Sequence, residues 1–251
     1  MTTFAGRAVV VTGGTKGIGL GIAEVFLAAG ADVLVCGRNQ PDTLPSAAGR
    51  TATFAAADVR DPAQAAAVVE AAASRFGRLD VLINNAGGSP DADAATVSPR
   101  FVERIVALNL LAPFYLAQAA NRVMQETAGG AIVNIGSVSA HQPAPGTAAY
   151  SAAKAGLLGL SRALALEWAP KVRVNHLTVG LIRTEASAEY YTDESAVAAL
   201  VPMQRLAVAS DVAAACLYLS SDAASYVTGA DLAVHGGGEI PARTAWFANR
   251  T

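Results

Sequence analysis

The sequence predicts a single α/β domain in which an open parallel sheet is covered by helices on both faces. Short runs rich in valine, isoleucine and alanine alternate with helix-like apolar patterns along the chain. Most of these runs are apolar without a break, as in strands that are buried on both faces. A glycine-rich turn follows the first run directly, and no linker or repeat interrupts the alternation.

The composition limits the class of protein and its partners. The chain has 251 residues, 53% hydrophobic and 15% charged, which argues for a substantial core and against disorder. A net charge of −2 gives no basic surface for nucleic acid. No secretory signal or long apolar span is present, so we expect a cytoplasmic protein without membrane contact. Two cysteines and three separated histidines lack metal-ligand spacing, and no metal is expected.

Apolar runs, caps and turn residues place the elements in order. Strands are expected at residues 7–12, 32–36, 51–57, 80–83, 131–135, 172–177 and 231–234, and helices at 62–76, 150–168 and 211–219. Asp61 is expected to cap the first of these helices and Ser210 the last. A long helical pattern runs over residues 101–116, with Pro113 as a kink and Asn109 inside it.

A glycine-rich turn joins the first strand to the next helical pattern. Residues 12–19 read Thr-Gly-Gly-Thr-Lys-Gly-Ile-Gly, with the spacing Gly-x-x-x-Gly-x-Gly. Such glycines let the backbone approach a ligand and leave a helix N-terminus facing phosphate, which favours a dinucleotide site. A tight strand-to-helix turn without a ligand is the alternative.

Arg38 follows the second strand, at a position where an acidic residue would favour a cofactor without a 2′-phosphate. An arginine can instead bind that phosphate with two hydrogen bonds, and Lys16 in the glycine loop can reach the same group. We therefore expect NADP(H) to be favoured over NAD(H). The alternative is that Arg38 is a solvated loop residue.

Polar side chains follow several other strands, where the ligands of open parallel sheets lie. Asp58 is either an adenine contact or an ordinary loop aspartate. Asn84 and Asn85 either fix a loop beside the cofactor or serve only in a turn. Ser137 can polarise a substrate carbonyl or simply end a strand. Asn109 is unfavourable inside a helix, so its amide either caps a distortion or serves the site.

Tyr150 and Lys154 lie four residues apart in a helical pattern and therefore share one face. A nearby ammonium group favours the phenolate and lowers the tyrosine pKa toward neutrality, where its hydroxyl can act as a general acid/base. The alternative is a surface pair on a helix. Only Lys16, Lys154 and Lys171 are lysine among 18 basic residues, and two of them fall in these motifs.

Together these motifs closely resemble the short-chain dehydrogenase/reductase family, from residue 7 to about residue 238. The resemblance rests on residues 12–19, Asp58, the Asn-Asn-Ala-Gly run at 84–87, and the tetrad Asn109, Ser137, Tyr150 and Lys154 in family order. It implies a Rossmann-type, doubly wound sheet of seven parallel strands, NAD(P)-dependent carbonyl or alcohol chemistry, and a homotetramer.

The resemblance also implies roles for single residues. Ser137 would hold the substrate oxygen and Tyr150 would pass the proton. Lys154 would lower the tyrosine pKa and bind the nicotinamide ribose, while Asn109 would order a water. Cofactor contacts are implied at Gly13, Thr15, Lys16, Gly17, Ile18, Gly19, Arg38, Asp58, Val59, Asn85, Ala86, Gly87, Tyr150, Lys154, Gly180, Ile182 and Thr184.

Two positions depart from the family pattern. Val179 replaces the usual proline before Gly180, which is expected to loosen the loop on the nicotinamide side. His235 replaces a usual aspartate near the end of the chain. Thr184 matches the position that contacts the carboxamide, so cofactor binding should survive both departures.

The sequence thus favours an NADP(H)-preferring enzyme that interconverts a ketone and a secondary alcohol. A 3-oxoacyl thioester and a steroid-like ketone are the candidate small-molecule substrates. A cofactor-sensing regulatory or scaffold protein on the same fold is the alternative, although it would not need a proton donor. Residues 185–203 resemble a mobile lid. The tail at 239–251 carries Trp246 and Phe247, which are expected at a subunit contact or packed on their own subunit.

Overall fold

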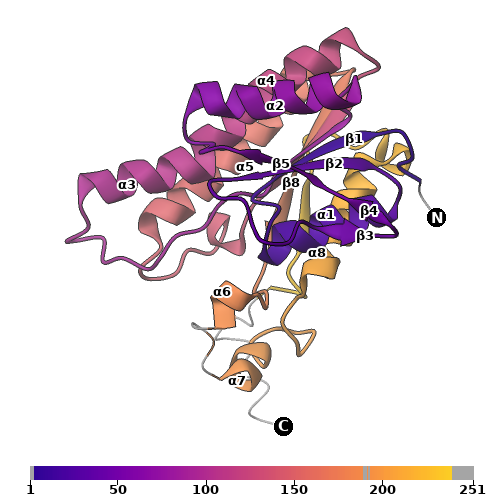
Figure 1. The fold of residues 1–251 in the computed structure, drawn as a ribbon. Helices are drawn as coiled ribbons and strands as arrows, with labels where there is room; N and C mark the ends of the chain where they lie inside the picture. The colour runs from indigo at the N-terminus through magenta and orange to yellow at the C-terminus, as the bar shows by residue number, and fades with distance from the viewer. Residues whose placement is uncertain (1–2, 189–190, 192, 239–251) are drawn as a thin grey trace.

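A sheet of seven strands runs through the centre of the molecule in the order β5-β2-β1-β6-β7-β8-β9 (Figure 1). The computed structural model describes residues 3–188, 191 and 193–238. The strands are β1 (Ala8–Thr12), β2 (Asp32–Gly37), β5 (Thr53–Ala56), β6 (Val81–Asn84), β7 (Gly130–Ile135), β8 (Val172–Val179) and β9 (Asp231–Val234). Every pairing in this sheet is parallel, which confirms the predicted doubly wound architecture.

The strand order reverses beside β1. The chain moves outward from β1 to β2 and β5, then returns to place β6 against the free edge of β1. In such sheets, ligands lie in the crevice outside the carboxyl ends of the strands at the point of reversal. The loops that follow β1 and β6 flank this crevice, so the topology places the glycine loop and the Asn-Asn-Ala-Gly run together.

Helices cover both faces of the sheet. The main helices are α1 (Gly17–Ala28), α2 (Pro62–Phe76), α3 (Pro99–Val106), α4 (Ala112–Glu126), α5 (Ala148–Trp168) and α8 (Ala209–Ser220). Shorter elements are β3 (Ser46–Ala47), β4 (Arg50–Thr51), η1 (Ala107–Leu111), η2 (Val138–Ala140), α6 (Glu185–Ala188), α7 (Glu194–Ala198) and η3 (Asp222–Ala224). One face carries α1 and α8 packed together, and α2 and α4 lie on the other with α5 (Figure 1). Within the described chain, no helix is long and apolar enough to span a membrane.

Helix boundaries confirm one predicted cap and correct another. The Asp61 side chain accepts the N–H groups of Ala63 and Gln64 at the start of α2, as predicted. The prediction for Ser210 is wrong, because α8 already begins at Ala209. The carboxylate of Asp211 closes the first turn instead by accepting the Val208 N–H at 2.8 Å.

The long helical pattern after residue 98 is interrupted by a π-helical turn. This turn, η1, separates α3 from α4 and contains the buried Asn109. Pro113 was expected to produce a kink, and the π-helical turn lies directly before it: Leu111 and Ala112 are helical, so the N–H that proline lacks is missing from a continuing helix. The irregularity therefore lies in the turn that precedes the proline and contains Asn109.

A line of buried polar side chains crosses the core beneath α5. Asn84 Nδ2 donates to Asn134 Oδ1 at 2.8 Å, and Asn134 Nδ2 donates to Ser161 Oγ at 2.8 Å. The Ser161 hydroxyl then donates to the Leu157 carbonyl at 2.7 Å. Hydrogen bonds are directional, so this line fixes α5 relative to β6 and β7.

Candidate active site

The glycine loop after β1 has the geometry that a dinucleotide site needs. Gly13 and Gly17 have φ values of +60° and +53°, which residues with side chains rarely adopt. A side chain at Gly19 would collide with the Gly13 carbonyl oxygen, so α1 approaches the loop closely. No side chain in the described residues caps α1, which leaves its first N–H groups for an anion. These residues fit a dinucleotide phosphate.

The loop after β6 is fixed to the end of β1. Thr12 Oγ1 accepts the N–H groups of Asn85 and Ala86, both at 2.9 Å, and Asn85 Nδ2 donates to the Thr12 carbonyl at 2.8 Å. Asn85 therefore fixes the loop, whereas Asn84 faces the core. No separate role for Thr12 was predicted, although a hydroxyl that ends an apolar strand is a signal for one.

The residues expected at the adenine end follow β2 and β5. Arg38 and Lys16 are both exposed, so each can reach a phosphate in solvent. Asp58 accepts hydrogen bonds from Arg60, whose Nε lies 2.9 Å from Asp58 Oδ1. The Arg60 hydrogen bond lowers the pKa of Asp58, and the charge of Arg38 lowers it further. Arg60 was missed from the sequence, and Val59 beside it is buried in the core.

Three tetrad residues meet at the carboxyl end of β7. Ser137 lies two residues after the end of this strand, and its Oγ accepts the Ser139 N–H at 3.1 Å. Tyr150 lies in the first turn of α5, and its hydroxyl is hydrogen-bonded to Ser137. Lys154 Nζ donates to the Ile135 carbonyl at 2.8 Å and lies 5.7 Å from the centre of the Tyr150 ring. The helical spacing thus brings the tyrosine and lysine to one side of the serine.

Burial dominates protonation in this group. The Lys154 ammonium is buried, which lowers its pKa to about 8. Burial also raises the pKa of Tyr150, and the Ser137 hydrogen bond only partly opposes that rise. The predicted lowering of the tyrosine pKa is therefore wrong for the protein alone. The physical reason is that removing the phenol from water outweighs the attraction of an ammonium that is hydrogen-bonded elsewhere.

Asn109 joins the loop after β6 to the π-helical turn. Its Oδ1 accepts the Gly88 N–H at 2.9 Å, and its Nδ2 donates to the carbonyls of Gly88 and Ile105, both at 3.0 Å. A Cβ at Gly87 would lie 2.8 Å from Asn109 Oδ1 and 3.3 Å from Lys154 Nζ. The amide thus stabilises a helix distortion, which is one of its two predicted roles, and its role in the site stays a prediction.

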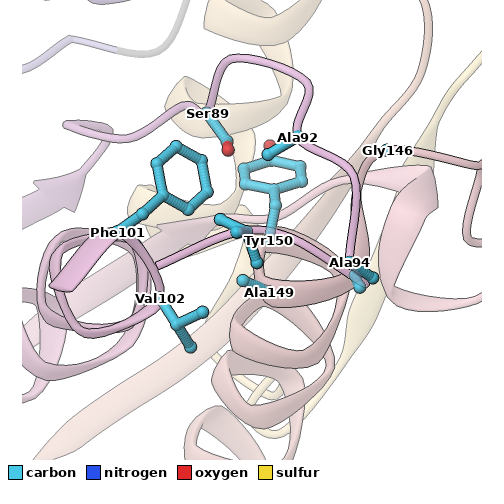
Figure 2. A pocket seen from close by; sticks show the side chains of 10 residues that line it. Ser89, Ala92, Ala94, Phe101, Val102, Gly146, Ala149 and Tyr150 are labelled. Atoms are coloured by element: carbon cyan, nitrogen blue, oxygen red, sulfur yellow. The ribbon is translucent and has the colours of Figure 1, made fainter. Parts of the chain in front are cut away.

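An apolar cavity of about 200 Å³ lies beside Tyr150 (Figure 2). In Figure 2 the Tyr150 ring lies beside the Phe101 ring, and Ala92 lies above it. Ser89 and Tyr150 are the polar side chains among the lining residues, and none of the lining residues is charged. The Ala92 N–H donates to the Gly146 carbonyl at 3.0 Å, which joins the two loops that border the cavity.

The segment after β8 returns to the glycine loop. Thr184 Cγ2 would lie 3.6 Å from a Cβ at Gly17, so the predicted carboxamide position is close to the predicted phosphate loop. Val179 ends β8 in register with Val234 and is buried, and the next N–H, of Gly180, donates to the Val234 carbonyl at 3.1 Å. Val179 thus continues β8 up to Gly180, and whether the loop beyond it is looser than with proline stays a prediction.

Ile182 and His235 lie near the same loop. Ile182 forms an isolated parallel bridge with Ala207, and His235 packs against Gly180. Of the expected lid, α6 and α7 are described, whereas residues 189–190 and 192 are outside the described part of the chain. The tail at 239–251, with Trp246 and Phe247, is outside it as well.

Comparisons with known proteins agree with this geometry. Residues 13–239 match the family described as enoyl-(acyl carrier protein) reductase. The chain is 37% identical over 239 residues to the 3-oxoacyl-[acyl-carrier-protein] reductase FabG of Salmonella typhimurium, covering 94% of this chain and 98% of that protein. It is 36% identical over 241 residues to the D-threitol dehydrogenase of Mycolicibacterium smegmatis, covering 92% of each.

A solved structure extends the match to three dimensions. The short-chain dehydrogenase/reductase from Brucella melitensis described as a glucose/ribitol dehydrogenase has a TM-score of 0.85 and 31% identity, covering 94% of this chain and 98% of that chain. Sequence and structure therefore agree over nearly the whole chain. The protein is an NAD(P)-dependent oxidoreductase that acts on CH–OH groups. It belongs to the short-chain dehydrogenase/reductase family.

Proposed function

We propose that the protein is an NADPH-dependent reductase of an apolar ketone, most simply the keto group of a 3-oxoacyl thioester. The observation that carries the proposal is the arrangement around Tyr150. Its hydroxyl is hydrogen-bonded to Ser137, a buried ammonium lies behind its ring, and an apolar cavity lies beside it. A proton donor, a second hydroxyl and an apolar surface are what a ketone of this kind requires.

The proposed reaction uses each of these side chains in turn. Ser137 and Tyr150 donate hydrogen bonds to the substrate carbonyl oxygen, which stabilises the negative charge that develops there. When bound, the nicotinamide supplies the hydride to the carbonyl carbon. Tyr150 gives its proton to the resulting alkoxide, and the Lys154 ammonium stabilises the phenolate that remains. The raised pKa of Tyr150 keeps this proton in place before reaction.

The cavity favours an acyl chain over the other substrate classes. A polyol would place several hydroxyls against alanine, valine and phenylalanine side chains, where they would lose hydrogen bonds to water. The cavity of about 200 Å³ is smaller than the roughly 300–1,000 Å³ of typical ligand sites. A rigid steroid-like ketone therefore needs more room than this cavity offers. A short 3-oxoacyl group is flexible and apolar, which suits the space beside Tyr150.

The cofactor preference rests on two exposed cations. Arg38 follows β2 and Lys16 lies in the loop after β1, both are exposed, and no acidic residue takes the Arg38 position, so both can neutralise a 2′-phosphate. Because the Asp58 carboxylate is already hydrogen-bonded to Arg60, it leaves these cations free for the cofactor. We therefore propose NADPH as the preferred reductant.

Turnover by the purified protein tests the proposal. NADPH oxidation is followed with a short 3-oxoacyl thioester, a steroid ketone and a keto sugar, each compared with the same substrate and NADH. The largest kcat/KM is expected for the thioester with NADPH. A larger value for the keto sugar would overturn the substrate class. Tight NADPH binding without turnover of any ketone would favour a cofactor-sensing protein instead.

A further inference from the structure

The carboxylate of Asp231 is contacted by three side chains that the proposed reaction does not use. Asp231 Oδ1 lies 2.8 Å from His176 Nδ1 and accepts the Thr178 hydroxyl at 2.7 Å, while Asp231 Oδ2 lies 2.9 Å from His141 Nε2. The Asp231 side chain is 15% exposed and that of His176 is 0% exposed. Two histidines that are 35 positions apart in the sequence therefore share one partly buried acceptor.

The hydrogen bond to Asp231 fixes the state of the His176 ring. A carboxylate only accepts, so the proton of the neutral imidazole must lie on Nδ1. Burial lowers the pKa of His176 and outweighs the opposing effect of Asp231, which keeps the ring neutral at pH 7. Its Nε2 is buried and has no hydrogen-bond partner among the described residues. This edge of the ring is therefore held by packing alone.

The unpaired edge of His176 lies against the residue before Ser137. A Cβ at Gly136 would overlap both Cε1 and Nε2 of His176, so the imidazole occupies the space beside the Gly136 Cα. The Gly136 N–H donates to the Leu177 carbonyl at 2.7 Å, and the preceding carbonyl, of Ile135, accepts from Lys154. Only glycine fits at this position, and the imidazole blocks its movement toward β8.

We infer that His176 is a positioning residue for Ser137, and that Asp231 holds it in place. The imidazole prevents Gly136 from shifting, so the Ser137 hydroxyl stays beside Tyr150. His141, four residues after Ser137, contacts the same carboxylate. Asp231 therefore fixes the chain on both sides of Ser137. It holds His176, which packs against the preceding residue, Gly136, and it contacts His141, which follows Ser137. This inference rests on the proposed role of Ser137 in the reaction.

A double-mutant cycle with Ser137 tests the inference. His176→Ala should lower kcat by roughly 10- to 100-fold, because a small misplacement of a catalytic group has an effect of this size. The dissociation constant for NADPH should stay within about twofold. In a Ser137→Ala background the same substitution should have no further effect on kcat, since the residue it positions is gone. An equal fold-loss in both backgrounds would overturn the inference.

A control on the same strand separates positioning from general damage. Asn175 is buried in β8 and makes two hydrogen bonds, to the Val227 carbonyl and the Ala230 N–H, neither of which involves Gly136. Asn175→Ala should reduce thermal stability and leave kcat close to that of the parent protein. A loss of kcat as large as that of His176→Ala would show that any damage to β8 suffices and would overturn the inference.

A milder variant covers the case in which His176→Ala does not fold. Asp231→Asn keeps the shape of the side chain but removes the charge that holds His176. It should lower kcat less than His176→Ala, and again only when Ser137 is present. Measuring Ser137→Ala and Tyr150→Phe first separates the two proposals. If both lose turnover and the cycle shows independent effects, only the role of His176 is overturned, whereas full activity of Ser137→Ala would overturn both.

Discussion

Tyr150 combines a partly buried side chain with two neighbours that can stabilise its charged form. Burial keeps the proton on the phenol, and Ser137 together with the ammonium of Lys154 offers stabilisation once the proton leaves. A group in this setting should matter for chemistry and little for binding. The ring also forms part of the cavity wall. Removing only the hydroxyl oxygen therefore separates the role of Tyr150 in proton transfer from its role in shaping the cavity.

Tyr150→Phe should therefore abolish most turnover and spare cofactor binding. General acid/base groups contribute on the order of 10²–10⁴-fold to rate, and we expect a loss of kcat in that range. Steady-state kinetics on an accepted ketone, together with a fluorescence titration of NADPH, measure the two effects. Turnover near that of the parent protein would show that another group supplies the proton.

The buried ammonium of Lys154 should make stability depend on pH in a specific direction. Its pKa is about 8 in the folded protein against 10.5 for a lysine in water, so between these values the unfolded chain binds a proton that the folded chain has lost. The stabilising contribution is complete above pH 10.5 and is lost progressively as the pH falls from 10.5 to about 8. The full difference corresponds to about 3 kcal/mol.

Lys154→Met isolates this effect. The free energy of unfolding of the variant minus that of the parent should be more favourable at pH 7 than at pH 10.5, by up to about 3 kcal/mol. Urea unfolding at both pH values gives the difference, with the exposed Lys171→Met as the control. A difference that does not change with pH would show that Lys154 is hydrated in solution.

Arg38 should decide the cofactor preference. Arg38→Asp places a negative charge at the proposed site of the 2′-phosphate, so affinity for NADPH should fall by about tenfold or more while affinity for NADH is kept or improved. Titration of both cofactors against both proteins measures the change. Arg122→Asp is the control, because it makes the same change of charge at an exposed position on α4. Arg50→Asp would not serve, because Arg50 forms an ion pair with Asp32. Equal affinities of the parent protein for both cofactors would reduce Arg38 to a solvated loop residue.

At the scale of the helix, α5 owes its position to polar contacts as well as to packing. One face of α5 carries small residues, which permit close packing but do little to prevent the helix from sliding along its axis. The hydrogen bonds that join Asn84, Asn134 and Ser161 fix its position along that axis. Because Tyr150 and Lys154 lie on the same helix, a shift of α5 would move both relative to Ser137.

Asn134→Leu should destabilise the protein and lower its activity together. The substitution leaves the Ser161 hydroxyl without its donor and Asn84 with only the Pro113 carbonyl at 3.2 Å, so we expect a loss of about 1–3 kcal/mol in the free energy of unfolding. Ser220→Ala is the control, since the buried Ser220 Oγ has no partner among the described residues. Denaturant unfolding and kcat should both change for Asn134→Leu and for neither in the control.

The sequence predicted those elements whose signal is local. Most of the parallel strands are nearly continuous apolar runs, and Asp61 followed by Pro62 is a complete helix start, so these elements were placed correctly. The strand expected at 51–57 is shorter, because Thr51 pairs with Ser46 in a separate antiparallel sheet. Ser210 was misassigned because a carboxylate one residue later competes for the same turn. The spacing of apolar residues could not reveal the π-helical turn at Asn109. One extra residue in a helical turn only shifts the positions at which the following apolar residues recur.

The parts of the site that depend on distant residues could not be predicted. Tyr150 and Lys154 are four residues apart and were found, but the sign of the tyrosine pKa shift depends on burial by loops elsewhere in the chain. His141, His176 and Asp231 are far apart in sequence, and none has a spacing that suggests a shared contact. A histidine inside a predicted strand was the available signal.

At the scale of the whole molecule, the described chain leaves large apolar side chains in solvent. Leu166 is 85% exposed and Leu111 37% exposed, on α5 and η1. A homotetramer, as implied by the family resemblance, would cover such groups. The predicted contribution of the tail to that assembly lies outside the described residues and remains a proposal.

Deleting residues 242–251 should weaken assembly. The segment contains Trp246 and Phe247, and burying one aromatic side chain is worth roughly 1.5–3 kcal/mol. Light scattering over a range of concentrations should show a tetramer for the full chain and smaller species for the deletion, with a raised KM if the tail also closes the cavity. The double substitution Trp246→Ser with Phe247→Ser tests the side chains without shortening the chain. An unchanged mass and an unchanged KM would leave the tail as packing on its own subunit.

The strand order also has a consequence for how the chain acquires its structure. During synthesis from the N-terminus, β1 can pair with β2 as soon as residue 37 has emerged, but its other edge must wait for β6 at residues 81–84. Until then a run of buried-type residues offers an open hydrogen-bonding edge, which is a site for unwanted strand addition. The phosphate loop thus begins to form early, whereas the loop that closes against it arrives about 70 residues later. The nascent chain therefore exposes the second edge of β1 before Ser137, Tyr150 and Lys154 have been synthesised.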